Sequence, residues 1–467
     1  MEVVVVVETD CRAELTRGHS YHSFSIRSAS ESAQVNPITT SPPREEEDGT
    51  NWRGPGGGEL NPQDAWLPIT QSRNGNTFSV TFHLLCSGIG FQALLLPVAF
   101  ATLGWAWGII CLRYIHLAVT AFGPKLGKLL GMFPVMYLSG GTCVQLIIIG
   151  GGTLKLFFNT VCDAKSVTGT ECFLMFTCLA IVVAQFPNLN SIARVSFIGT
   201  ITAIVYYTLI WALSVAKGRV NDVSYDPPLI ESNMDRFGGI LNALGIIFLA
   251  FRGHNVILEI QGTLPFSPKH PTHKSMWRGV TISYALIAMC LLPLALCGFW
   301  VYGNKIPSSI EEILTAAAKF HGHKTSKSVL GLICVLVVVN CSSAFQIYGM
   351  VVFDNLELRY SSKKNKPCAR WLRVAFRIFF GGFVFFIAVA FPFLISLAVL
   401  FGGLAFPLTY AYPCLMWIAI KKPKPRGAVW CINMGLGCLG LCVSLLLIVA
   451  ASWNIAHNGL KANFFRP

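Results

Sequence analysis

The chain has 467 residues, of which 53% are hydrophobic and only 12% are charged, and its mean hydropathy is +0.57. An ordinary soluble domain carries about a quarter charged residues, so the composition excludes a soluble protein and indicates a membrane protein with several spans. The net charge of +14 does not indicate nucleic-acid binding, because the basic residues lie in short loops where membrane topology and anionic lipid account for them.

Residues 1–77 differ in composition from the rest of the chain. They hold 6 Lys and Arg against 11 Asp and Glu, whereas the remaining 390 residues hold 30 and 11. The segment is rich in Ser, Pro and Gly and has no apolar periodicity. We therefore expect a disordered cytosolic tail at 1–77 and a transmembrane domain at 78–467.

Apolar runs of about 20 residues, long enough to cross about 30 Å of hydrocarbon, predict the membrane spans. Ten such runs lie at 78–101, 130–158, 172–187, 192–216, 237–260, 279–302, 328–353, 372–393, 395–420 and 430–456. An additional segment at 103–122 makes a poor span, because Arg113 and His116 fall near its centre, where a cation costs a few kcal/mol or more.

Three loops rich in Lys and Arg, at 269–278, 359–373 and 421–426, belong in the cytosol by the positive-inside bias. Counting spans outward from them also places "GPKLGK" at 123–128 in the cytosol. We expect an integral protein of the plasma membrane with its N-terminal tail in the cytosol and its C-terminus outside. A cytosolic tail requires the segment at 103–122 to cross the membrane.

Two spans contain the same kind of interruption. The first reads "CSGIGFQALLLPVAF" and the sixth reads "IIFLAFRGHNVILEIQG". Each glycine weakens a helix by about 1 kcal/mol relative to alanine. Glycine-interrupted spans at matching positions are typical of transporters built from inverted repeats. We predict an all-α fold in which spans one to five and six to ten are the repeats and an eleventh span is appended.

An unwound span exposes backbone N–H groups at one half-helix and C=O groups at the other, and an amino acid zwitterion needs both. Amides of the first break would hold the carboxylate, and carbonyls of the sixth span would receive the ammonium. The candidates are Ser87, Gly88, Ile89, Gly90 and Phe91 in the first span, with Leu249, Ala250, Phe251 and Gly253 in the sixth. The alternative is that the glycines only let helices pack closely, which is also our interpretation of "SGGTCVQLIIIGGGT" in the third span.

Ionisable and polar residues inside the spans suggest further roles. Glu259 is either a proton carrier or a permanent ion-pair partner, and His254 is either a proton carrier or a hydrogen-bonded packing residue. Asn340, Ser343 and Gln346 share one face of the eighth span, which lines the substrate pathway or bonds to neighbouring helices. Asp354 and Glu357 lie at its cytosolic end.

Two cysteines flank the predicted extracellular loop at 159–171. Cys162 and Cys172 are candidates for a disulfide in that oxidising compartment, with free thiols as the alternative. No Cys or His cluster has metal-ligand spacing, so we expect neither a metal nor a cofactor. The spans also contain no nucleophile–base pair and no paired carboxylates, which argues against an enzyme.

Several stretches carry a family resemblance, namely "DAWLPITQSRNGN", "CSGIGFQALLLPVAF", "FPVMYLSGGTC", "QFPNLNSIARVSFIG", "FRGHNVILEIQGT", "NCSSAFQIYGM" and "YAYPCLMW". From about residue 61 onward, the chain resembles the plant lysine/histidine transporter-like branch of the amino acid/auxin permease family. The resemblance implies eleven spans, a five-plus-five inverted repeat of the LeuT type and proton-coupled uptake of amino acids. It also implies discontinuous spans at residues 87–90 and 250–255.

One departure from this family affects the second span. "LGWAWGIICL" runs directly into "RYIHLAVTAFG", which resembles the family's cytosolic linker, so most of one helix is missing. We expect a symporter whose partners are an amino acid, a proton and the lipid bilayer. The alternatives are an amino acid receptor on a transporter fold, or a non-functional isoform.

Overall fold

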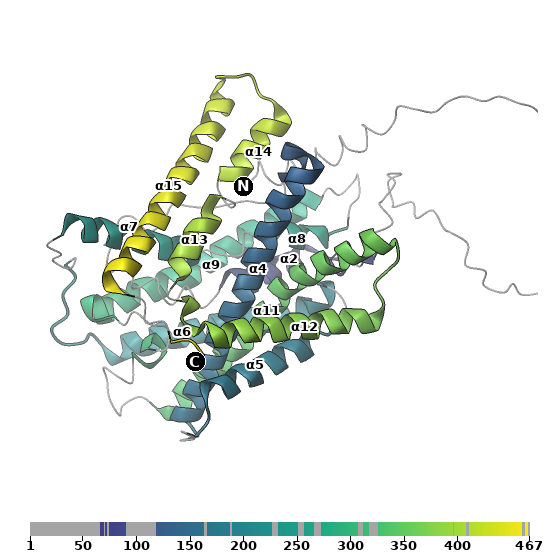
Figure 1. Ribbon diagram of the computed structural model, residues 1–467. Coiled ribbons are helices and arrows are strands. Elements are labelled where there is room, and N and C mark those ends of the chain that lie inside the picture. Colours follow the sequence, from purple (N-terminus) through teal and green to yellow (C-terminus); the bar gives the residue numbers. More distant parts are fainter. Residues whose placement is uncertain are drawn as a thin grey trace, which may run out of the picture.

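The computed structural model describes residues 66–69, 71, 74–89, 118–162, 166–186, 189–226, 232–250, 256–265, 272–306, 312–316, 326–395, 397–407, 411–459 and 463–465. Across these ranges the protein is helical and contains no β-strand (Figure 1). In the part of the chain that the structure describes, six helices are long and apolar enough to cross a membrane: Tyr137–Thr160, Ala193–Lys217, Lys274–Lys305, Lys327–Ser361, Arg370–Ala390 and Ala428–His457. They match six of the predicted spans, and the shorter apolar helix Gly169–Val183 matches a seventh.

Four helices form the centre of the molecule. They are α4 (Ala118–Thr160), α5 (Gly169–Val183), α11 (Lys327–Lys364) and α12 (Arg370–Ala390), and each packs against the other three. The glycines of α4 allow part of this packing, because a Cβ on Gly150 or Gly151 would lie 2.3 Å from the Phe176 ring or 2.4 Å from the Phe173 ring. The predicted packing role of the glycine-rich third span is therefore confirmed at these two positions.

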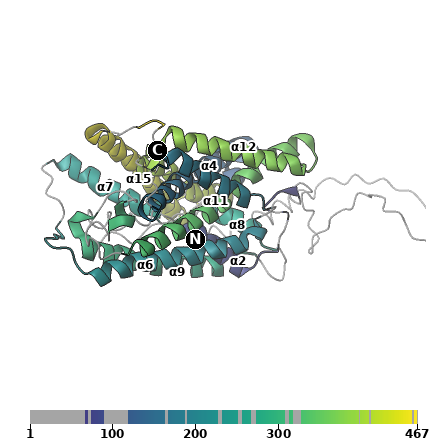
Figure 2. The ribbon, with the colours of Figure 1, turned by 90° about the horizontal axis from the view of Figure 1, so that it is seen from below.

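A second group lies on the other side of α11, formed by α2 (Thr77–Gly88), α6 (Ala193–Lys217) and α9 (Thr272–Tyr302). The short helix α8 (Ile257–Gly262) contacts α2 and α9. In Figure 2, α6 and α9 lie on the opposite side of the molecule from α12, with α4 and α11 between them. One continuous apolar core joins the two groups.

The remaining helices form a flank, seen at the upper left of Figure 1. There α15 (Ala428–Asn458) packs against α7 (Asn233–Ala250), α13 (Ala398–Phe406) and α14 (Tyr412–Lys421). Leu241, Phe406, Leu447 and Ala450 form a small separate core between these helices. Three 3₁₀ helices complete the described elements: η3 (Asn190–Ile192), η4 (Gly303–Lys305) and η6 (Pro392–Ile395).

Two helix boundaries differ from the prediction. The span at 395–420 contains two α-helices, α13 and α14, and Pro407 directly after α13 has no N–H to donate to the preceding turn. The predicted loop at 123–128 is part of the 43-residue helix α4 instead. Most of the irregular segment at 103–122 lies outside the described residues, and only its last five residues, 118–122, belong to α4.

Loops that are far apart in the chain meet at two places. At one end, Pro68 accepts a hydrogen bond from the backbone of Leu189, and Thr263 accepts one from Gly75. At the opposite end, residues 218–226 bond to residues 300–306. The predicted tail is too long at its C-terminal end, because Leu67 and Ile69 are buried; residues 1–65 lie outside the described residues, and their disorder stays a prediction.

Candidate functional site

The first span stops being helical at the predicted place. α2 begins at Asn76, whose side chain accepts a hydrogen bond from Ser79 N, and it ends at Gly88. Ile89 then leaves the helical conformation, with φ −85° and ψ 85°, while its own N–H still donates to Leu85 O at 2.8 Å. Ile89 N–H is therefore not available to a carboxylate, and Gly90 and Phe91 lie outside the described residues.

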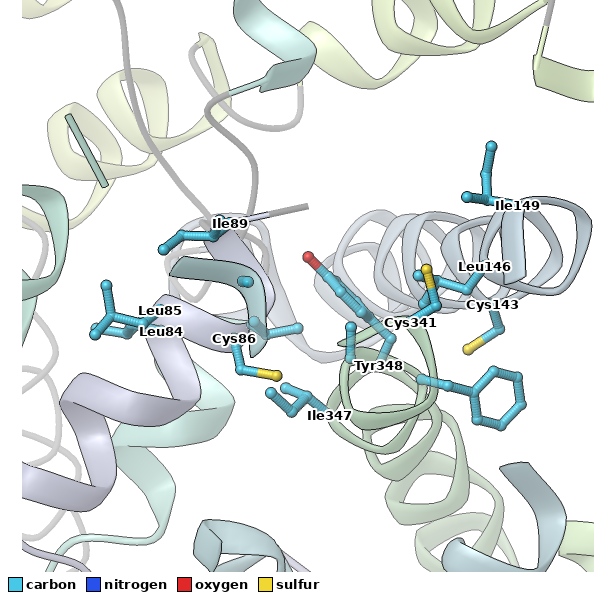
Figure 3. Close-up of a cluster of buried hydrophobic side chains, with 14 of the residues drawn as sticks. Leu84, Leu85, Cys86, Ile89, Cys143, Leu146, Ile149, Cys341, Ile347 and Tyr348 are labelled. Carbon is cyan, nitrogen blue, oxygen red and sulfur yellow. The ribbon is translucent and has the colours of Figure 1, made fainter. Parts of the chain in front are cut away.

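The end of α2 is held by a tyrosine from the continuous helix α11. Tyr348 is buried, and its hydroxyl donates to Ser87 O at 3.0 Å, while Ser87 Oγ donates to Leu84 O. Figure 3 shows the Tyr348 ring between the α2 side chains on one side and Cys143 and Leu146 of α4 on the other. The last turn of α2 is thus fixed to α11 at the point where the span is interrupted.

Near the end of α2, the helices α2, α6 and α11 cross closely around Gly199 of α6. A Cβ on Gly199 would lie 2.5 Å from Ser343 Cβ of α11 and 2.8 Å from Cys86 Sγ of α2. Asn340 Nδ2 donates to Gly199 O at 2.9 Å, and Ser343 Oγ donates to Val339 O within its own helix. Asn340 therefore bonds to a neighbouring helix and Ser343 to its own helix, while their substrate contact stays a prediction.

His83, which our sequence interpretation did not single out, is a further polar residue on α2. It is 0% exposed, and Nδ1 lies 2.7 Å from Ser196 Oγ of α6. Nε2 is buried and has no hydrogen-bond partner in the described part of the chain. When Nδ1 carries the hydrogen and donates to Ser196, Nε2 keeps a lone pair that can accept a proton. The sequence signal was the spacing of four between His83 and Ser87, which puts both on one helical face.

The sixth span is also divided, into α7 and α8. α7 is described as far as Ala250, and α8 begins at Ile257 after a bend at Val256. Phe251, Gly253 and His254 lie outside the described residues, and Glu259 is half-buried in α8, which contacts α2.

The structure also describes Gln346 and the two cysteines that the sequence singled out. Gln346 is buried in α11 and donates to Ala180 O of α5 at 3.0 Å, so it also joins helices. Cys162 and Cys172 are free thiols, the first exposed after α4 and the second buried in the first turn of α5. The predicted disulfide is therefore not formed, because Cys172 faces the core and Cys162 faces away from it.

Known proteins match this chain over most of its length. A family model described as "Transmembrane amino acid transporter protein" matches residues 111–456. The chain belongs to this family. Lysine histidine transporter-like 8 of Arabidopsis thaliana is 50% identical over 440 residues, covering 88% of this chain and 84% of that protein. Lysine histidine transporter-like 7 from the same plant is 43% identical, with 88% and 91% covered.

A solved structure supports the fold. Mhp1, a nucleobase-cation-symport-1 family transporter solved in a closed conformation with bromovinylhydantoin bound, has a TM-score of 0.51 at 12% identity, and the match covers 86% of this chain and 98% of Mhp1. This amino acid transporter therefore has the LeuT-type fold, as predicted. It is an integral membrane protein that transports amino acids, and it is not an enzyme.

Proposed function

We propose that this transporter is a symporter that moves an amino acid together with a proton. The observation that carries the proposal is the end of α2 at Gly88, together with the contact of α2 with the short helix α8 of the sixth span. Carbonyls in the last turn of α7 suit an α-ammonium group, and the amides of Gly90 and Phe91 are the candidates for the carboxylate. Backbone groups freed by interrupted spans are typical partners of a zwitterion in transporters of this kind, which supports the proposal.

We assign the proton site first to His83, with Glu259 and His254 as the alternatives. His83 is buried four residues before Ser87, and Ser196 orients its imidazole. A proton taken up at Nε2 places a cation next to the break of α2, so its presence and the position of α2 are energetically linked. That linkage is what proton coupling requires.

The sidedness proposal rests on the basic loops. The turn between α11 and α12 and the turn between α14 and α15 carry clustered Lys and Arg, which favours a cytosolic position for both. The N-terminal tail is then cytosolic and the C-terminus is outside. A plasma-membrane location is part of the same proposal.

One observation favours a second candidate function. The alignment with lysine histidine transporter-like 8 runs over 440 positions, which exceeds the number of residues that make up the covered 88% of this chain. The alignment therefore contains gaps in this chain. Such gaps support the deletion that we inferred from the shortened second span. A chain without that span is a candidate receptor that binds an amino acid without moving it, or a non-functional isoform.

Reconstitution separates these possibilities. Purified protein in liposomes is given radiolabelled L-histidine or L-lysine, with and without an imposed inward proton gradient. Symport predicts accumulation that depends on the gradient and collapses when a protonophore is added. Binding without uptake would support the receptor, and neither binding nor uptake would support the non-functional isoform.

A further inference from the structure

The end of α11 and the start of α12 bury several polar side chains that the proposed transport function does not use. Glu357 and Ser361 lie one turn apart on α11 and are 1% and 0% exposed. Arg373 and Arg377 lie one turn apart on α12, and Arg377 is 3% exposed. Because α11 packs against α12, the two helices bring two guanidinium groups to one buried carboxylate.

Arg373 already has partners for its charge and its donors. Its Nε lies 2.9 Å from Glu357 Oε2, as an ion pair without hydrogen-bond alignment. Its Nη2 donates to Trp66 O at 2.8 Å. Asp354, one turn before Glu357, accepts the N–H of Ile69 at 3.0 Å. The nearest acids are therefore engaged with Arg373 and with the segment before α2.

Arg377 keeps two donors without an acceptor. Its Nε and Nη2 are buried and have no hydrogen-bond partner in the described part of the chain, and no carboxylate there forms an ion pair with it. The guanidinium lies over the Phe353 ring, 5.5 Å from its centre. Ser361 Oγ is also buried without a partner among the described residues. Buried polar groups are normally paired, so these orphan donors call for a ligand.

The thiol of Cys368 shows that the charges surround one point. Cys368 lies in the turn between α11 and α12 and is 6% exposed. Burial raises the pKa of its thiol, the Glu357 carboxylate adds to the rise, and Arg373 and Arg377 oppose it. All three charged groups are therefore within electrostatic reach of one sulfur atom. One carboxylate against two guanidinium groups leaves an excess of positive charge there.

We propose that Arg377 and Ser361 form a binding site for a small monovalent anion, such as chloride, between α11 and α12. An anion without hydrogens accepts from all the orphan donors and supplies the negative charge that Arg377 lacks. A water molecule accepts hydrogen bonds but brings no charge to a buried cation. The site does not depend on the proposed proton symport, because neither the interrupted spans nor His83 contribute to it.

The first test measures thermal unfolding of the purified protein in detergent while chloride replaces gluconate at constant ionic strength. Gluconate is too bulky for a site whose atoms are this deeply buried, so the exchange varies only the anion that fits. An anion that binds the folded state stabilises it according to its concentration relative to Kd. We expect a saturable rise of the unfolding midpoint by about 2 °C or more.

Three variants locate the effect. Arg377→Met keeps most of the side-chain volume but removes the charge and the donors, so the chloride-dependent rise should disappear. Ser361→Ala removes one donor, and the chloride concentration at half effect should increase about fivefold. Arg359→Met is the matched control, because Arg359 is exposed on α11 two residues after Glu357, and it should keep the full rise.

The reactivity of Cys368 provides a local measurement on the wild-type protein. A bound anion disfavours the thiolate, which is the form that reacts with N-ethylmaleimide. Labelling of Cys368, quantified on its peptide by mass spectrometry, should slow by about threefold or more when chloride replaces gluconate. Labelling of the exposed thiol of Cys162 should not change.

The outcomes separate a built site from its alternatives. Chloride effects on unfolding and on Cys368 that Arg377→Met abolishes would support the proposal. A midpoint that rises equally in the wild type, Arg377→Met and Arg359→Met would show a general salt effect, and a wild type without either response would show a site that holds only water. Both of these results reject the proposal. If Arg377→Met does not fold, the shift in Ser361→Ala and the response of Cys368 decide in its place.

Discussion

α2 and α11 meet in the middle of the molecule, and only one of them is continuous. α11 runs for 38 residues, and its polar residues Asn340 and Gln346 donate to carbonyls of neighbouring helices. α2 ends after 12 residues, and its polar residue His83 keeps one nitrogen without a partner in the described part of the chain. The difference teaches that α11 acts as framework, whereas α2 keeps one buried polar atom, His83 Nε2, for the proton that we propose it takes up.

The strongest test of that contrast is His83→Gln, because glutamine retains a hydrogen bond to Ser196 but cannot carry a positive charge. We expect uptake driven by a proton gradient to fall by about tenfold or more, while exchange of amino acid at equal pH on both sides persists. Uptake and exchange of radiolabelled L-histidine by proteoliposomes measure both quantities. Ser196→Ala is the control that keeps the imidazole, and gradient-driven uptake that survives in His83→Gln would move the proton site to Glu259 or His254.

The framework side of the contrast is tested by Gly199→Ala. The new methyl group would lie 2.5 Å from Ser343 Cβ, so the crossing of α6 and α11 must widen. We expect a loss of about 1–3 kcal/mol in the free energy of unfolding, seen as a lower thermal midpoint in detergent. Gly140→Ala on α4, where a Cβ would meet nothing within 4 Å, is the matched control and should be neutral or slightly stabilising. Equal effects of the two changes would refute the close crossing.

Asn340→Ala tests whether Asn340 stabilises the fold or contacts the substrate. Loss of the bond from Nδ2 to Gly199 O should reduce the free energy of unfolding by about 1 kcal/mol. Because Asn340 Nδ2 already donates to Gly199 O, we expect the apparent affinity for L-histidine to change by less than about twofold. Thermal unfolding and concentration-dependent uptake measure these two effects. A large fall in affinity with unchanged stability would restore Asn340 to the substrate site.

The smallest expected effect on stability belongs to Tyr348→Phe, which removes only the hydroxyl that donates to Ser87 O. Stability should fall by less than about 1.5 kcal/mol, but the end of α2 loses its tie to α11. We therefore expect maleimide labelling of Cys86 to increase a few-fold. Unchanged labelling would show that the packed junction at Gly199 holds α2 without help from the tyrosine.

The sequence predicted the features that depend on local chemistry. Gly88 marked the end of α2, and α8 begins at Ile257, shortly after the polar run at 252–255, which lies outside the described residues. The third interruption was missed although Pro407 and Pro413 signalled it, because the apolar run around them suggested one span. His83 was missed because a lone histidine in an apolar helix resembles a packing residue.

The long-range contacts could not be predicted from the sequence, for a different reason. "WLPI" at 66–69 is four residues long, too short for any periodicity, and the side chains that bind it come from residues 354 and 373. Asp354 and Glu357 drew notice as acids at a helix end, but nothing local indicates that Arg373 and Arg377 face them. Only the packing of α11 against α12 brings these charges together.

The length of α4 has a practical consequence. A helix of 43 residues is about 65 Å long, about twice the thickness of the hydrocarbon layer, so roughly half of this rod stands clear of lipid. An antibody fragment bound to the part of α4 outside the lipid would add an asymmetric feature to the particle. That feature would help to align images of this small protein in electron microscopy. Distances from the bound fragment to a probe on residues 66–69 would then measure how this segment moves during the transport cycle.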